Sequence, residues 1–376
     1  MTAPNALVQI TPPRRTVELK IDGETVSAPE GSTILDVCQQ HGRDIPTLCY
    51  LETLHPVNAC RVCVVEVENS RVLVPSCARK IEPGMVVQTD SPRVRHSRKM
   101  VLEFLASSVD LSTTPHAAEW VAAYECHPER YGPPAPPAAA GVRDAAHAGH
   151  HEPPDPDFAA TVHQPVKIDN ELYVRDYGKC ILCYKCVEAC GIDYQNTYAI
   201  AVAGRGFDAR ISTEFSVPLP GSACVYCGNC IAVCPTGALM FSSEHDRREA
   251  GTWDESRQTV TDTICPYCGV GCTLSLHVQD NQIVKVTSPF DVSVTYGNLC
   301  IKGRFGWQYV QNRRGDGSGK RSNGVPRRPQ DVAAVTDGAG KPHGTGRNGG
   351  VAGDGDGKET ERETERETGR TTETSE

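Results

Sequence analysis

The chain has 376 residues with a formal net charge of −9 at pH 7, 27 prolines, 34 glycines and only 6% aromatic residues. So few aromatic side chains argue against one large hydrophobic core and favour several small domains. The acidic balance argues against nucleic acid as the main partner, because nucleic-acid-binding surfaces are basic. No segment approaches the roughly 18 consecutive apolar residues that a membrane-spanning helix needs.

The first ordered element is predicted to be a β-hairpin. Apolar and polar side chains alternate over residues 17–21, and Asp22-Gly23 is a turn pair that precedes further strand residues. Ser32 is then predicted to cap a short helix that ends at Gly42. Cys38 lies on the apolar face of that helix, so we expect it to be a core residue.

Two more strands are predicted over residues 62–67 and 72–74, where valine predominates. The order strand, strand, helix, cysteine-bearing loop and strand resembles that of a β-grasp ferredoxin. A helix is predicted over residues 96–105. The basic residues near its start, Arg98 among them, are expected to lie on its solvated face.

The centre of the chain contains a linker, an internal repeat and a further ordered unit. Residues 132–165 are rich in proline, alanine and histidine, which is typical of a linker, although a histidine-rich tract could also bind a metal. Residues 166–250 contain an approximate repeat of one cysteine motif. Residues 258–312 form the last ordered unit, with strands predicted over residues 273–278 and 283–287.

The C-terminal segment, residues 313–376, contains no Leu, Ile, Met, Phe, Tyr or Trp. It cannot bury enough apolar surface to fold, so it is predicted to be a disordered tail. The patterns along the whole chain predict an α+β protein made of small ordered units. These units cover residues 16–95, 96–131, 166–250 and 258–312.

Cysteine is the most informative residue type in this chain. Sixteen of its 18 cysteines fall into four sets of four, and closely spaced cysteines with a more distant fourth are the expected ligands of an iron–sulfur cluster. This spacing, without an apolar leader segment, favours metal in a reducing, cytoplasmic compartment over a disulfide framework. The four sets are Cys49, Cys60, Cys63 and Cys77; Cys180, Cys183, Cys186 and Cys190; Cys224, Cys227, Cys230 and Cys234; and Cys265, Cys268, Cys272 and Cys300.

The first set has the spacing C-x10-C-x2-C-x13-C. Together with residues 46–50 and 59–67, it resembles the large iron–sulfur subunit of respiratory complex I and related hydrogenase and formate dehydrogenase subunits. The resemblance implies a [2Fe–2S] cluster; zinc is the alternative, although zinc knuckles favour two C-x2-C pairs. Those families place a His-plus-three-cysteine cluster next. Here Cys126 is the only cysteine between residues 96 and 131, so that site is predicted to be lost.

The second and third sets, called the first run and the second run below, both have the spacing C-x2-C-x2-C-x3-C. This spacing resembles that of two-cluster bacterial ferredoxins, in which the fourth cysteine of each run ligates the other cluster. The resemblance implies one [4Fe–4S] cluster on Cys180, Cys183, Cys186 and Cys234. It implies another on Cys224, Cys227, Cys230 and Cys190.

The last set begins with C-P-Y-C-G-V-G-C and ends with C-I-K-G. It resembles the N-terminal cluster domain of molybdopterin oxidoreductases, and formate dehydrogenase alpha subunits most closely. The resemblance implies that Lys302 bridges the cluster and a pterin in full-length relatives. A zinc ribbon is the alternative, but it would need two C-x2-C pairs. The implied ligands of this third [4Fe–4S] cluster are Cys265, Cys268, Cys272 and Cys300.

The family resemblance covers residues 16–312 and implies the electron-relay part of an NAD-linked, molybdenum-dependent formate dehydrogenase alpha subunit. Electrons would pass from the pterin through the clusters to a diaphorase-type flavin subunit that reduces NAD. The domain that holds the molybdenum bis-pterin cofactor in full-length relatives does not follow in this sequence. We therefore expect a truncated or frameshifted product, with a genuine short subunit as the alternative. We also expect no catalytic residue and no formate oxidation by the isolated chain.

Two alternatives remain open. One is the iron–sulfur subunit of a complex I-like NADH dehydrogenase or of an NAD-reducing hydrogenase. The motif around Cys300 argues against the hydrogenase, because its small diaphorase subunits end after the ferredoxin pair. The more distant alternative is a zinc-binding scaffold, which would lack the brown colour of an iron–sulfur protein.

Overall fold

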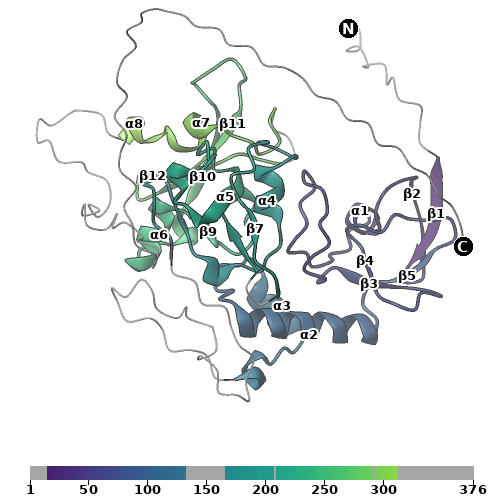
Figure 1. Cartoon of the computed structure of the whole chain (residues 1–376). Helices are drawn as coiled ribbons and strands as arrows, with labels where there is room; N and C mark the ends of the chain where they lie inside the picture. Colours follow the sequence, from purple (N-terminus) through teal and green to yellow (C-terminus); the bar gives the residue numbers. More distant parts are fainter. Residues whose placement is uncertain (1–14, 133–165, 207–208, 291–293, 312–376) are drawn as a thin grey trace, which may run out of the picture. The chain divides into compact units, whose positions relative to one another are not determined.

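The computed structural model of the chain describes residues 15–132, 166–206, 209–290 and 294–311 (Figure 1). The predicted tail lies outside these residues, as does the predicted linker apart from Gly132. The described residues pack into several small apolar clusters rather than one large core, as the composition predicts.

The N-terminal region is a five-stranded mixed sheet with one helix. The strands follow the order β2-β1-β5-β3-β4, and β1 pairs antiparallel with β2 but parallel with β5. The elements are β1 (Thr16–Ile21), β2 (Glu24–Pro29), α1 (Ile34–Gln40), β3 (Val64–Val67), β4 (Val74–Pro75) and β5 (Val86–Gln88).

The predicted hairpin is confirmed by the pairing of β1 with β2. Every second residue of β1 is buried, as its alternating sequence requires, and Asp22 and Gly23 both have the positive φ angles of a tight turn. The predicted cap of α1 is wrong. Thr33, not Ser32, is the N-cap: its hydroxyl accepts from Asp36 N at 3.1 Å, and the Asp36 carboxylate accepts from Thr33 N at 2.8 Å.

Helix α2 (Pro92–Ser108) is longer than predicted, because Ser91 caps it and Pro92 is compatible with its first turn. It is followed by α3 (Ala117–Ala123). The expectation that Arg98 faces solvent is wrong, since its side chain is only 2% exposed. Its guanidinium donates to Val64 O and to the Tyr124 hydroxyl, both at 2.9 Å, and so joins α2 to β3.

The middle region contains two similar halves. In each half a cysteine-bearing loop leads into a short helix, and strands β6 and β9 pair antiparallel across the two halves. The hairpin of β7 and β8 lies in the insertion between them. The elements are β6 (Tyr173–Arg175), α4 (Lys185–Cys190), β7 (Ala201–Ala203), β8 (Arg210–Ser212), α5 (Asn229–Val233), β9 (Leu239–Phe241) and α6 (Ser242–Glu249).

The last region is a three-stranded antiparallel sheet followed by two short helices. The predicted turn at Asp280-Asn281 is confirmed, because both residues are left-handed and join β11 to β12. Strand β10 was not predicted, because all of its side chains are exposed and it lacks a buried face. The elements are β10 (Thr259–Ile264), β11 (Thr273–Gln279), β12 (Gln282–Thr287), α7 (Ile301–Phe305) and α8 (Gln308–Gln311).

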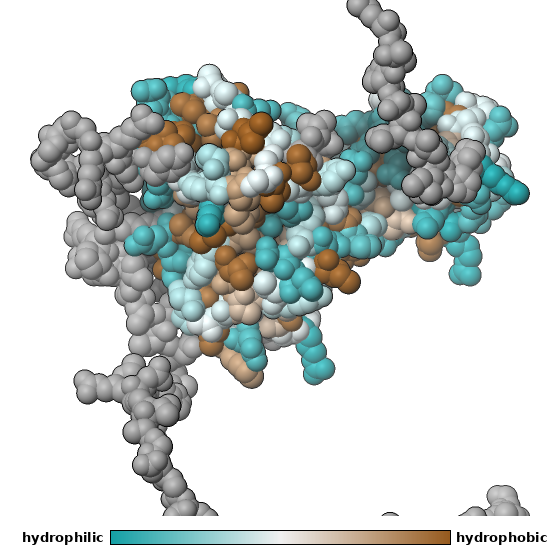
Figure 2. All heavy atoms as spheres, turned by 90° about the horizontal axis from the view of Figure 1, so that it is seen from above, coloured by the Kyte–Doolittle hydropathy of each residue, from teal (hydrophilic) through white to brown (hydrophobic). Residues whose placement is uncertain are grey.

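Short 3-10 helices complete the described regular structure. They are Pro128–Tyr131, Tyr177–Lys179, Glu214–Ser216, Leu219–Gly221 and Glu255–Arg257. None of the helices in the described ranges combines the length and apolar character required to span a bilayer. On the face shown in Figure 2, apolar residues are interspersed with hydrophilic ones.

Replacing Arg98 by methionine tests the contact between α2 and β3. The substitution keeps the apolar part of the side chain but leaves Val64 O without its donor, and an unsatisfied buried carbonyl costs about 1–3 kcal/mol. We expect a lower midpoint of thermal unfolding by circular dichroism. Arg79→Met is the control, because Arg79 pairs with Glu82 at the surface, where ion pairs contribute at most about 1 kcal/mol. Equal midpoints for the two variants would contradict the role of Arg98.

Candidate metal centres

The first cysteine set gathers beside the N-terminal sheet. Cys63 directly precedes β3, and its Sγ lies 3.4 Å from Cys77 Sγ. Cys60 N donates to Cys49 Sγ at 3.4 Å. Cys77 interacts electrostatically with the other three thiols, so the structure brings all four together.

Hydrogen bonds between these thiols divide them into two pairs. The bond with Cys49 lowers the pKa of Cys60 to about 6, and the bond with Cys77 lowers the pKa of Cys63 to about 7. The same bonds raise the pKa values of Cys49 and Cys77. Each pair therefore shares one proton readily, and removing the second proton requires nearby positive charge. A bound metal centre supplies such charge.

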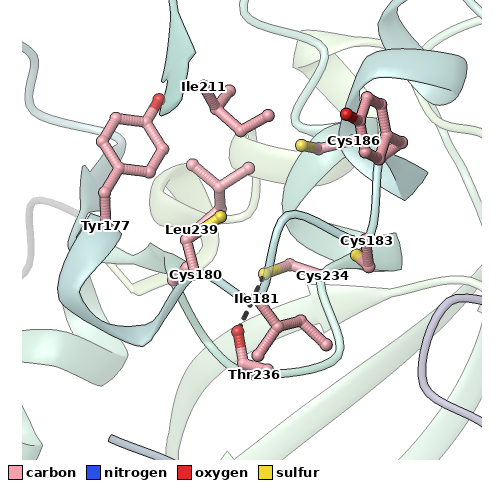
Figure 3. Close-up of a pocket in the computed structure, with 11 residues that line it drawn as sticks. Tyr177, Cys180, Ile181, Cys183, Cys186, Ile211, Cys234, Thr236 and Leu239 are labelled. Carbon is pink, nitrogen blue, oxygen red and sulfur yellow. Dashed lines mark hydrogen bonds between the residues drawn. The ribbon is translucent and has the colours of Figure 1, made fainter. Parts of the chain in front are cut away.

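The second centre is a cavity that both cysteine runs build together. Cys180, Cys183 and Cys186 of the first run line it, and Cys234 reaches it from the second run (Figure 3). The remaining lining is largely apolar, with Ile181, Ile211 and Leu239 among it. The structure therefore places the fourth cysteine of the second run beside the first three of the other run.

The third centre has the reciprocal composition. Cys230 is half-buried and interacts electrostatically with Cys224 and Cys227 of its own run and with Cys190 of the first run. Two hydroxyl groups contact sulfurs of this set. Tyr173 Oη lies 3.3 Å from Cys224 Sγ. Thr197 Oγ1 lies 3.4 Å from Cys190 Sγ.

The two runs position their thiols through the same backbone geometry. The amide two residues after the first cysteine donates to its sulfur at 3.4 Å, from Leu182 to Cys180 and from Tyr226 to Cys224. Both donors have positive φ angles, at 51° and 55°. A left-handed non-glycine residue costs on the order of 1 kcal/mol. These strained turns direct their backbone N–H groups toward sulfur. A metal-bound thiolate is a hydrogen-bond acceptor, so such donors suit it.

Burial raises the thiol pKa values in both of these centres. The pKa of Cys180 is raised to about 12 and that of Cys183 to about 11, while burial raises the values of Cys186 and Cys230 well above the usual range. A thiolate in an apolar space is unfavourable unless cations compensate its charge. Four thiols around one such space therefore fit a multinuclear iron core held by four thiolates.

The fourth set is less enclosed than the others. Cys265 is buried and its N–H donates to Cys272 O at 2.8 Å, whereas Cys268 and Cys300 are exposed. Lys302 is also exposed, on α7. Across the described residues, no three His, Cys, Asp or Glu side chains are placed to hold a single metal ion.

Both cysteines outside the four sets are buried. Cys38 lies in the core beside β1 and β2, as predicted. Cys126 packs near α2, and its Sγ lies 3.7 Å from Lys99 O. No local pattern pointed to the buried residues Lys185 and Arg304, or to the Tyr173 contact to sulfur, because each depends on a partner far away in the chain.

Three family models match separate segments of the chain. Residues 14–92 match a 2Fe-2S iron-sulfur cluster binding domain, and residues 179–238 match a 4Fe-4S dicluster domain. Residues 258–312 match a molybdopterin oxidoreductase Fe4S4 domain. The chain is a multi-cluster iron–sulfur electron-transfer module.

The module is similar to parts of larger redox proteins. It is 33% identical over 79% of its length to an NADH-quinone oxidoreductase subunit of Rhizobium meliloti, and 39% identical over 61% to an NADP-reducing hydrogenase subunit of Solidesulfovibrio fructosivorans. It is 24% identical over 78% of its length to a putative formate dehydrogenase of Staphylococcus aureus. These matches cover 32%, 36% and 31% of the respective relatives, so the chain spans about a third of their length.

Replacing Tyr173 by phenylalanine tests the hydroxyl contact to Cys224. A metal-bound thiolate can only accept, so the hydroxyl donates, and such hydrogen bonds to cluster sulfurs help to set the reduction potential. We expect the centre that includes Cys224 to shift to lower potential in an EPR-monitored redox titration, while the other centres do not move. Tyr226→Phe is the control, because it keeps the Tyr226 amide bond to Cys224. An unchanged potential in Tyr173→Phe would show that the hydroxyl does not bond the coordinated sulfur.

Proposed function

We propose that the module is the electron-relay region of an NAD-linked, molybdopterin-dependent formate dehydrogenase alpha-type chain. The observation that carries this proposal is that the last cysteine set and Lys302 occur in one chain with the N-terminal region and the middle region, which hold the other three cysteine sets. The match of residues 258–312 to a molybdopterin oxidoreductase domain supports it, as does the likeness to a putative formate dehydrogenase. A flavin- and NAD-binding subunit in the cytoplasm is the redox partner that this proposal implies.

The proposed cofactors are one [2Fe–2S] cluster, on the first cysteine set, and three [4Fe–4S] clusters. The parallel pairing of β1 with β5 around α1 supports a β-grasp fold for the region that holds the first set. The shared cavity and the reciprocal neighbours of Cys230 support crossed ligands for the two runs. Bound clusters supply one-electron chemistry, and the chain's own contribution is to hold the thiolates, exclude water and hydrogen-bond the sulfurs.

Metal analysis of the anaerobically reconstituted protein tests the proposed clusters. We expect about fourteen iron atoms per chain and an equal amount of acid-labile sulfide, from one two-iron and three four-iron centres. Near-stoichiometric zinc with little sulfide would support the scaffold alternative instead. About ten iron atoms per chain with an equal amount of sulfide would show that the exposed fourth set holds no cluster.

Serine substitutions test the crossing of ligands between the two runs. Cys186 and Cys190 lie on one helix, but the proposal assigns them to different clusters. Cys186→Ser and Cys190→Ser should therefore impair different EPR centres, and the [2Fe–2S] signal should persist in both variants. Cys126→Ser is the control, because Cys126 belongs to none of the four sets. Loss of the same centre in both variants would overturn the crossed assignment.

A complex I-like or hydrogenase-type subunit is the second candidate function. The higher sequence identities to the NADH-quinone oxidoreductase and hydrogenase subunits favour it. The two candidates are distinguished by purifying the tagged protein anaerobically from its natural host, together with the chains that stay bound. If the first proposal is right, one of the bound chains carries the molybdenum domain, and formate should reduce the clusters of that complex. Reduction by NADH or hydrogen, but not by formate, would favour the second.

A further inference from the structure

Two cations are buried where the middle region meets its neighbours. Arg304 is 0% exposed and Lys185 is 8% exposed, although charged side chains are seldom buried without an opposite charge. No carboxylate forms an ion pair with either side chain within the described ranges. Each cation instead lies near cysteine thiols that belong to two different candidate centres.

Arg304 lies between the third and fourth cysteine centres. Its Nε donates to Cys227 O and its Nη2 donates to Asn229 Oδ1, both at 2.9 Å. Its charge interacts with Cys227 and Cys230 on one side and with Cys300 on the other. Its remaining nitrogen, Nη1, has no hydrogen-bond partner within the described part of the chain. Burial lowers the pKa of Arg304 to about 10, which still leaves the guanidinium charged near neutral pH.

The loop of the second run is shaped to receive this arginine. A Cβ on Gly228 would lie 2.3 Å from Arg304 Cδ and 2.9 Å from Phe305 Cζ. The glycine therefore lets α7 approach closely, and its φ of +71° also favours glycine. Phe305 stacks on Tyr173 with ring centroids 6.2 Å apart, which fixes the same helix end in the middle region.

Lys185 has the corresponding position in the first run. It stands directly before Cys186, just as Asn229 stands directly before Cys230. Its Nζ donates to Leu48 O at 3.5 Å, in the residue before Cys49. Burial lowers the pKa of its ammonium group, and the nearby thiols Cys183 and Cys234 of one centre and Cys49 and Cys60 of the N-terminal centre oppose this shift. The position before the third cysteine is thus Lys185 in the first run. In the second run it is Asn229, which binds Arg304 of the last region.

We propose that Lys185 and Arg304 are junction cations, positioning residues that raise the reduction potentials of the clusters on both sides of each junction. The proposal rests on the cluster assignments proposed above. Reducing a cluster adds one negative charge, and a buried positive charge nearby stabilises that reduced form. Because the interaction weakens with distance, each cation acts on its two adjacent centres and leaves the far pair unchanged.

Charge-removing variants of the reconstituted protein test the proposal by redox titration. Arg304→Gln should shift the centre on Cys227 and Cys230 and the centre that includes Cys300 to lower potential, with no change at the [2Fe–2S] centre. Lys185→Gln should give the reciprocal result, lowering the potentials of the [2Fe–2S] centre and the centre on Cys183 and Cys234. The charge-preserving variants Arg304→Lys and Lys185→Arg should stay close to the unmodified protein.

Asn229→Asp tests the Arg304 junction without removing the arginine. It adds a negative charge at the atom that binds Arg304, so it should lower the same two potentials even if Arg304→Gln loses its clusters. Unchanged potentials in Arg304→Gln and Asn229→Asp at full iron content would overturn the proposal, as would an equal shift of all centres. Low iron in the unmodified protein would instead contradict the cluster assignments themselves.

Discussion

The desolvation of thiolates is the constraint on which the rest of this structure depends. Cys186 and Cys230 are surrounded by apolar side chains, and burial raises their pKa values well above the usual range. A set of four thiolates in such a place is stable only with a metal core that compensates their charge and amides or hydroxyls that bond the sulfurs. The left-handed turns at Leu182 and Tyr226 follow from this need, because they direct backbone N–H groups at sulfur.

Each run contributes a cysteine to the other run's candidate centre, and one hydrophobic cluster that includes Tyr173, Ile211 and Phe241 packs around them. Cys234 completes the cavity of the first run, and Cys190 joins the thiols of the second. Each centre thereby ties together segments that are more than 30 residues apart in sequence. If the two centres bind clusters as proposed, metal binding and folding are coupled, since neither half can complete its ligand set alone. The pairing of β6 with β9 and the aromatic contacts around Tyr173 also join the two halves.

The same repeat also sets how the middle region meets its neighbours. The residue before the third cysteine of each run contacts an adjacent region. Lys185 donates to Leu48 O of the N-terminal region, and Asn229 accepts from Arg304 of the last region. Polar and charged groups at these contacts replace part of the apolar packing that usually joins domains. The contacts therefore determine spacing and local charge together, and both affect electron transfer between neighbouring centres.

The sequence by itself determined the four cysteine sets, the hairpins at Asp22-Gly23 and Asp280-Asn281, and the role of Cys38 in the core. These features are local, since ligand spacing, turn residues and strand alternation act over a few residues. Only the tertiary structure decided that Arg98 and Arg304 are buried, that Tyr173 contacts Cys224, and that β10 is a strand. The contacts of the arginines and of Tyr173 depend on partners distant in sequence, and β10 lacks the buried face that a local pattern would reveal. A basic residue looks the same in the sequence whether it meets water or a buried thiol.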